Sequence, residues 1–263
     1  MLWLNLSLWQ TFAVIVGAGV VFNGIGTLLV ALFKSNAQLA HGNDPGGNKF
    51  GFLEPITGLV TVFVLTMAWI QYNDVVGRIQ RETTTLVLLK ESAGQFTEPT
   101  RSRVLAALAG YVEAVGGPEW RAMAANGHSE VAEQALEALV RTYGAADLRT
   151  SRDESLMRFS GPVVRRLNDD RQGRLLATTF ELRQPLLVML GAAVVVTIAF
   201  SWVFGYPTMR GKLAMGTLFT SGLMLIVFMV SVLAHPFRGP LAVPNDAYAD
   251  ILWEITHPEG ESP

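Results

Sequence analysis

The stretch that decides the fold runs from Leu6 to Phe33, LSLWQTFAVIVGAGVVFNGIGTLLVALF, and contains no charged side chain. A helix that crosses a bilayer needs about 17 to 25 mostly apolar residues, so this stretch is long enough to span one. Residues 56–72, 185–204 and 213–234 are equally free of charge. We therefore predict an all-α integral membrane protein with four transmembrane helices.

The composition supports this reading and excludes several other classes of protein. Half of the 263 residues are hydrophobic and only 16% are charged, which is too apolar for an ordinary soluble chain of this length. The net charge of -2 gives no sign of a nucleic-acid partner. The chain has no cysteine, so disulfides and thiolate chemistry are excluded.

Four crossings divide the chain into segments on two sides of the membrane. We predict transmembrane helices in residues 1–72, joined by an extracytoplasmic loop at 34–55, and again in 185–234. Residues 73–184 form a cytoplasmic helical domain and 235–263 a cytoplasmic tail. Arg and Lys near the helix ends are slightly more frequent on this side, which favours cytoplasmic N- and C-termini.

The predicted cytoplasmic domain has helical periodicity throughout. Val75, Ile79, Leu86 and Leu89 continue the helical spacing of the second transmembrane segment, so that helix is predicted to extend into the cytoplasm. Further helices are expected after Pro99, after Ser129 and between Asp147 and Leu182.

Glycine and proline predict three irregular places in this helical pattern. Breaks are expected at residues 116–118, GGP, and at Gly161-Pro162. Between the first two crossings, Asn36–Phe52 is rich in glycine, asparagine and proline and is predicted to be irregular.

The first transmembrane segment carries small and polar residues that are costly against lipid. Gly19, Asn23, Gly24 and Gly26 are predicted to form a helix-packing face, because small residues let helices approach closely and a buried amide finds a partner there. A ligand or ion contact by Asn23 is the alternative.

One stripe of the second transmembrane segment suggests a pore. Val60, Val64, Met67, Gln71 and Asp74 lie at helical spacing, and the stripe turns polar at its cytoplasmic end. Several copies around an axis would form an apolar constriction, which is a known way to gate ions. A lipid-facing or core stripe is the alternative.

Two further features of this segment bear on the pore. Glu54 stands at the opposite mouth, and the two carboxylates, Glu54 and Asp74, favour cations. Leu59, Phe63 and Ile70 form a rival face of the same helix.

The sequence offers little catalytic chemistry. The four histidines are far apart and form no metal-binding pair, and the acidic residues near the C-terminus lack the spacing of a calcium loop. No nucleophile with an adjacent base is evident. We therefore predict no catalytic residues, no metal and no cofactor.

Several motifs resemble the bestrophin-like family of bacterial membrane proteins. They comprise Trp69, Tyr72 and Glu82, then Tyr111 and Glu119-Trp120, and the run HPFRG at residues 235–239. The resemblance implies a homo-oligomer in the bacterial inner membrane, pentameric like the bestrophin channels, with the second helices around a central pore. It places the narrow neck among Val60, Phe63, Val64 and Met67. The acidic calcium clasp of animal bestrophins has no clear counterpart.

The HPFRG run also has a physical reading. Pro236 cannot continue the fourth transmembrane helix, and Gly239 permits a turn behind it. We interpret His235, Pro236, Phe237 and Gly239 as a hinge between that helix and the cytoplasmic domain, with His235 as a pH-sensitive contact. Simple termination of the helix is the alternative.

The sequence leads to three hypotheses about the function of this protein. The first is a homo-oligomeric ion channel with membrane lipid around it. The second is a non-conducting membrane scaffold or sensor whose cytoplasmic helices bind a protein. The third, a membrane enzyme acting on lipid, lacks a convincing nucleophile, and the chain is predicted not to be an enzyme.

Overall fold

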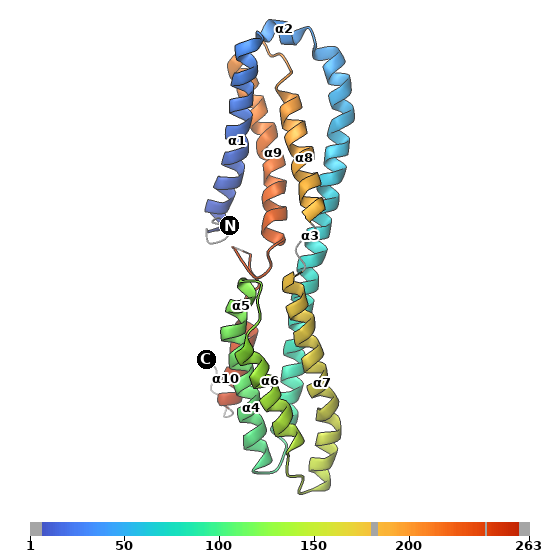
Figure 1. The fold of residues 1–263 in the computed structure, drawn as a ribbon, viewed down its shortest axis with the longest axis vertical. Coiled ribbons are helices and arrows are strands. Elements are labelled where there is room, and N and C mark those ends of the chain that lie inside the picture. Colours follow the sequence, from blue (N-terminus) through green and yellow to red (C-terminus); the bar gives the residue numbers. More distant parts are fainter. Residues whose placement is uncertain (1–6, 180–183, 240, 258–263) are drawn as a thin grey trace. The chain divides into compact units, whose positions relative to one another are not determined.

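A computed structural model describes residues 7–179, 184–239 and 241–257 of the chain. Within these residues all regular secondary structure is helical. Figure 1 shows the helices along the chain: α1 Leu8–Phe33, α2 Asn36–Ala40, α3 Asn43–Ala93, α4 Thr100–Ala114, a π-helical turn Val115–Glu119, α5 Trp120–Ala124, α6 Glu130–Gly144, α7 Ser151–Thr179, α8 Gln184–Ser201, α9 Met209–Leu233 and α10 Asp246–Thr256. The all-α fold class is therefore confirmed.

The chain separates into two compact units. The first contains residues 1–72 and 181–242, and the second contains 73–180 and 243–263. Helix α3 contributes its first part to one unit and the remainder to the other.

Among the described residues, three helices are long and apolar enough to cross a membrane, as judged by length and composition. They are α1, the part of α3 that begins at Gly46, and α9. A fourth apolar helix, Pro185–Ser201, falls below that length within the described residues. The chain thus has the character of a membrane protein, and the count of four crossings remains a prediction.

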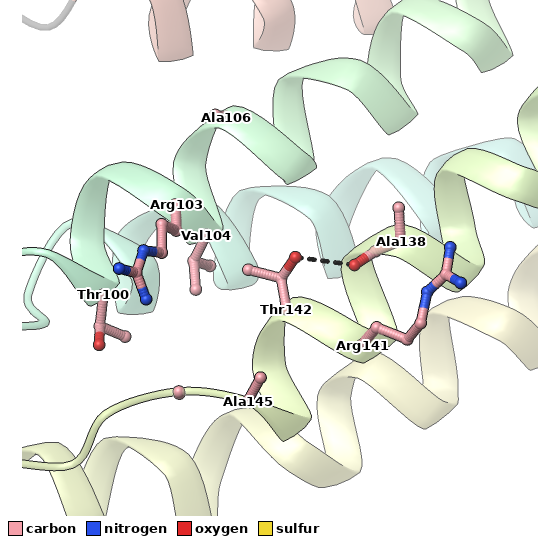
Figure 2. A pocket seen from close by; sticks show the side chains of 9 residues that line it. Thr100, Arg103, Val104, Ala106, Ala138, Arg141, Thr142 and Ala145 are labelled. Carbon is pink, nitrogen blue, oxygen red and sulfur yellow. Dashed lines mark hydrogen bonds between the residues drawn. The ribbon is translucent and has the colours of Figure 1, made fainter.

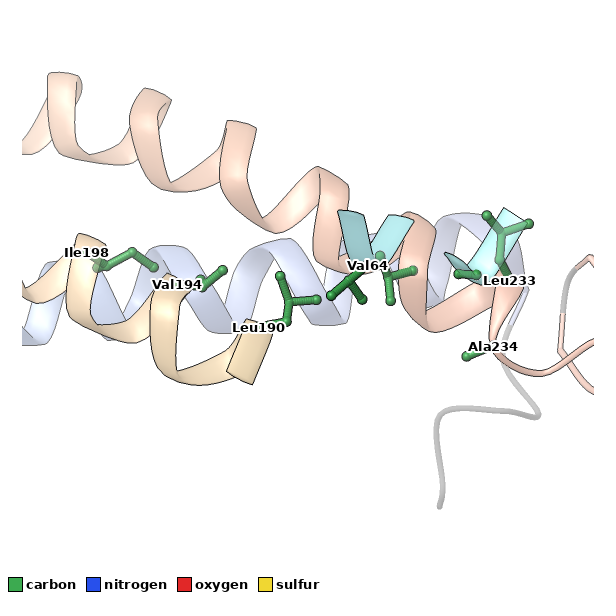
Figure 3. Packing of buried hydrophobic residues seen from close by; sticks show 8 residues of the cluster. Val64, Leu190, Val194, Ile198, Leu233 and Ala234 are labelled. Atoms are coloured by element: carbon green, nitrogen blue, oxygen red, sulfur yellow. The ribbon is translucent and has the colours of Figure 1, made fainter. Parts of the chain in front are cut away.

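The first unit is held together by apolar side chains from three helices. Val64 and Ala68 of α3 meet Leu190, Val194 and Ile198 of α8, and the end of α9 completes this core (Figure 3). A buried hydrogen bond joins the hydroxyl oxygens of Thr57 in α3 and Thr197 in α8 at 2.7 Å. Hydroxyl pairs of this kind link helices where water is absent.

The second unit confirms the predicted extension of the second transmembrane segment. Val75, Ile79, Leu86 and Leu89 are all buried on one side of α3. Helix α6 begins after Ser129 and ends at Gly144, as the sequence predicted. Helix α10 packs against α4 in this unit.

Three predictions of irregular structure were wrong, because helices continue through glycine and proline here. Residues 36–52 are almost entirely helical, in α2 and in the start of α3. Asn43 fixes that start by exchanging two hydrogen bonds of 2.9 Å with the backbone of Gly205. The predicted loop at 34–55 is therefore mostly helix.

The other two breaks lie in the second unit. Helix α7 runs through Gly161 and Pro162 without interruption. At residues 116–118 the chain does not leave the helix but widens into a π-helical turn, which accommodates Pro118.

Candidate functional site

Helix α3 has a packed face within the first unit. Val64 is 0% exposed, and Val60 lies partly buried against the same core. Both residues belong to the stripe that the sequence suggested for a pore. Because Val64 packs against α8 and α9 of its own chain, it cannot line a pore on an oligomer axis. The prediction that Val64 lines a pore was therefore wrong.

The opposite side of α3 is exposed within its unit and is called the free face below. Leu59 is 72% exposed, and Phe63 and Ile70 are exposed as well. This is the rival face that the sequence left open. Phe52, Ile56 and Met67 extend it along the helix. A continuous exposed apolar stripe on a long helix can face lipid or another copy of the chain.

The polar residues at the two ends of the predicted second transmembrane segment do not form a simple pair of charged pore entrances. Asp74 follows Phe63 by about three helical turns and so lies on the free face. Its carboxylate is paired with Arg78 of the next turn at 2.8 Å. Glu54 precedes Phe63 by about two and a half turns, on the other side of the helix. Gln71 is half-buried.

The predicted packing face of α1 exists within the protomer, with one exception. A methyl group on Gly19 would lie 2.3 Å from Met224 of α9, and one on Gly26 would lie 2.1 Å from Trp202, which directly follows α8. Asn23 is buried between them. Gly24 has open space around its Cα within the protomer, so its place on a packing face remains a prediction.

The exit from α9 forms a tight turn. Helix α9 ends at Leu233, and the Nδ1–H of His235 donates to the carbonyl of Ser231 at 2.9 Å. Gly239 has φ 82°, a left-handed backbone that favours glycine. Phe237 is buried and Pro236 lies inside the turn. A hinge role for these residues remains a prediction, as does a pH-sensitive role for His235.

The second unit contains a chain of buried charges that the sequence did not reveal. Arg174 of α7 pairs with Glu82 of α3 and, at 2.7 Å, with Glu119 of the π-helical turn. Glu119 also accepts a hydrogen bond of 2.6 Å from Arg171. The hydroxyl of Tyr111 donates to Glu82 at 2.9 Å.

The balance of charge explains how this network stays buried. Its two arginines and two glutamates are each 0–2% exposed and sum to zero formal charge. Burial opposes ionisation of Glu119, but the hydrogen bonds and charges of Arg171 and Arg174 outweigh burial and lower the pKa of its carboxyl group. Burial, and then the charge of Glu82, raise the pKa of Tyr111. The network therefore ties α3, α4 and α7 together, and the lowered pKa of Glu119 favours its charged form.

Part of this network had a signal in the sequence. Glu82, Tyr111 and Glu119 are among the motif residues quoted above. Arg171 and Arg174 gave none, because arginines are frequent along α7 and their spacing does not distinguish a buried arginine from a solvated one. Only the packing of α7 against α3 and the π-helical turn identifies them.

A cavity of about 570 Å³ lies between α4 and α6 in the second unit. Arg103 and Arg141 line it from the two helices (Figure 2). Thr142 does not point a free hydroxyl into it, since this group donates to the carbonyl of Ala138 at 2.8 Å. Both arginines are exposed, so their charges are stabilised by water and require no ligand.

Comparison with known families accounts for the shared motifs. The sequence pattern of the bestrophin-like domain matches residues 17–248, which is most of the chain. The chain belongs to the bestrophin-like family. The matched region of this bestrophin-like protein includes the buried network and the free face of α3. Comparison with curated proteins and with solved structures gave no match.

Proposed function

We propose that this bestrophin-like protein is a homo-oligomeric ion channel in which copies of α3 surround an axial pore. The observation that carries the proposal is the free stripe of α3 with Leu59, Phe63 and Ile70. In a bundle of several copies, these side chains would form an apolar neck that gates by excluding water. Family membership supports an oligomer, and five copies in the bacterial inner membrane is the arrangement we propose.

The proposed neck differs from the one that the sequence suggested. Val60 and Val64 stabilise the protomer, and Phe63 is the bulky residue of the free face. A preference for cations loses support, because Asp74 is paired with Arg78 and Glu54 lies away from the stripe. The proposal therefore concerns conduction and the position of the neck, with N- and C-termini in the cytoplasm.

A scaffold or sensor without conduction remains the second candidate. It would be favoured by a large apolar patch on the second unit. The exposed apolar residues there, such as Leu88, Val131, Val140 and Phe159, lie on three different helices. No observation on the described residues therefore favours this function over conduction.

Conductance in planar bilayers tests the channel. We expect the wild-type protein to conduct and Leu59→Ala to raise the single-channel conductance, because a smaller side chain widens the neck. Leu218→Ala is the matched control: Leu218 of α9 is 71% exposed, against 72% for Leu59, but lies on a helix that we do not place at the axis. Absence of current, or equal conductance in both variants and wild type, would refute the proposal.

A further inference from the structure

A cavity of about 340 Å³ lies in the first unit, between α1, the start of α3, the segment after α8 and the start of α9. Asn23, Phe50, Tyr206, Lys212, Gly216 and Phe219 are among the residues that line it. The lining includes one cation, Lys212, and four aromatic side chains, Phe50, Phe204, Tyr206 and Phe219. The cavity lies within one protomer, and its lining does not include the residues Leu59, Phe63 and Ile70 of the proposed neck.

Lys212 is a buried cation, and no acidic side chain in the described part of the chain forms an ion pair with it. The side chain is 3% exposed. Its ammonium group donates to the carbonyl of Trp202 at 2.9 Å, which uses one of three donors. Lys212 also lies in the first turn of α9, where the helix dipole disfavours a positive charge. Both conditions would be relieved by an anion.

Asn23 supplies a second, independent sign of a ligand. The side chain is 1% exposed and lines the same cavity. Its Oδ1 accepts a hydrogen bond of 3.2 Å from the indole of Trp202, while its Nδ2 has no hydrogen-bond partner among the residues described. A buried amide hydrogen without a partner is costly, and an acceptor atom in the cavity would remove that cost.

The aromatic wall favours an apolar part on the same ligand. The ring centroid of Phe50 lies 5.4 Å from the ring centroid of Phe204 and 5.8 Å from that of Phe219. All three side chains line the cavity. They provide an apolar surface next to the two donors, as is common in sites for small amphiphilic molecules.

We propose that this cavity binds the anionic group of an amphiphile, a phosphate or carboxylate joined to an apolar portion. Lys212 contributes its positive charge and its remaining donors, and Asn23 donates through Nδ2. The apolar portion lies against Phe50 and its aromatic neighbours. A lipid headgroup and a soluble carboxylate or phosphate share this chemistry. The lipid would reach the cavity from the membrane, and the soluble anion would reach it from water.

Thermal unfolding of the purified full-length protein in neutral detergent tests the site and distinguishes the two sources. The soluble probes are inorganic phosphate and octanoate, and the lipid probes are phosphatidylglycerol and, as an uncharged control, phosphatidylcholine. We expect a saturable rise of the unfolding midpoint with octanoate or phosphatidylglycerol and none with phosphatidylcholine. If phosphatidylglycerol alone raises the unfolding midpoint, the ligand is a lipid headgroup. If octanoate also raises it, the site accepts soluble carboxylates as well.

Two variants with a matched control locate the effect. Lys212→Met removes a charge-assisted hydrogen bond, so the apparent affinity should fall about tenfold or more. Arg210→Met removes the same charge from the same turn of α9, but Arg210 is exposed, so the affinity should remain unchanged. Equal affinities in Lys212→Met and wild type, or no response to any anion, would overturn the proposal.

Because Lys212 also holds the backbone of Trp202, Lys212→Met can fail to fold for that reason alone. Gly216→Ala leaves Lys212 intact and disturbs the other donor, since the added methyl group would lie 2.8 Å from Nδ2 of Asn23. We expect a weaker apparent affinity in this variant too. Full wild-type affinity in Gly216→Ala would contradict the role of Asn23.

Discussion

Asp153 shows how one carboxylate can connect three segments of the second unit. It accepts hydrogen bonds from the backbone and hydroxyl of Thr97, at 3.0 and 2.8 Å, and from those of Thr150, at 3.0 and 2.9 Å. Its own backbone N–H donates to Thr150, so the two residues cap the start of α7 reciprocally. These bonds favour the charged form and lower the pKa of Asp153 from 3.8 to about 2, although burial opposes the shift.

The lowered pKa predicts a loss of stability in acid. A depressed folded-state pKa stabilises the protein fully above the unfolded-state value of 3.8, and this contribution is lost as the pH falls towards about 2. Asp153→Asn should therefore lower the unfolding midpoint at pH 7, and its difference from wild type should shrink below pH 3.8. Thermal melts across this range measure it. Asp169→Asn, an exposed change on the same helix, should match wild type throughout.

The buried network makes a second prediction at the scale of residues. Arg174→Met leaves Glu82 without its cation, and removing one partner of a buried pair costs about 3–5 kcal/mol. Arg165→Met, an exposed change on α7, should have little effect. Denaturant unfolding of both variants gives the comparison.

A double variant tests whether charge balance is the cause. Glu82→Leu combined with Arg174→Met removes one charge of each sign and leaves Arg171 paired with Glu119. The double variant should therefore be less destabilised than the sum of its two single variants. A purely additive loss would show that Glu82 and Arg174 stabilise the unit independently.

At the scale of elements, α1 closely approaches α9 and the segment that follows α8 through small residues. Gly19 and Gly26 lie against Met224 and Trp202, whereas Gly24 lies on a different side of the helix. In lipid such contacts depend on close packing, because lipid tails are as apolar as the helix surfaces and the hydrophobic effect does not drive the helices together. A single methyl group on α1 can therefore decide whether this helix fits against its neighbours.

Two alanine substitutions on α1 test this contact. Gly26→Ala should destabilise the first unit by about 1–3 kcal/mol, because the new methyl group overlaps Trp202. Gly24→Ala meets nothing within 4 Å and should leave the protomer at wild-type stability. Thermal melts in detergent compare the two. A stable Gly26→Ala variant would mean that Trp202 moves aside without cost.

At the scale of the whole molecule, assembly is the property on which conduction depends. The chain has no native cysteine, so a single introduced cysteine reports only its own position. Phe63→Cys should form disulfides between copies under oxidation, because identical positions on the proposed axial face approach one another. Leu218→Cys on α9 should remain monomeric in denaturing electrophoresis. Crosslinking through Leu218 alone would place α9, and not α3, at the axis.

The sequence predicted the helical class, the long α3 and the small residues of α1, because these depend on local periodicity and composition. It did not predict that Asn43 would fix the start of α3 or that α7 would continue through Pro162, since both depend on neighbouring segments. The role of the carboxylates at the ends of the predicted second transmembrane segment also required the fold, because Asp74 is paired with its neighbour Arg78.

What the sequence determined by itself is that these helices can enter a membrane and that α3 has a helical repeat of apolar residues. Which side of α3 is free was decided only by the tertiary structure: Val64 and Phe63 are neighbours in an apolar run, and only the positions of α8 and α9 bury the first and expose the second. The same holds for Arg174 and Lys212. The sequence does not show whether a charged side chain is solvated or buried, and only a buried charge requires a partner to offset the loss of water.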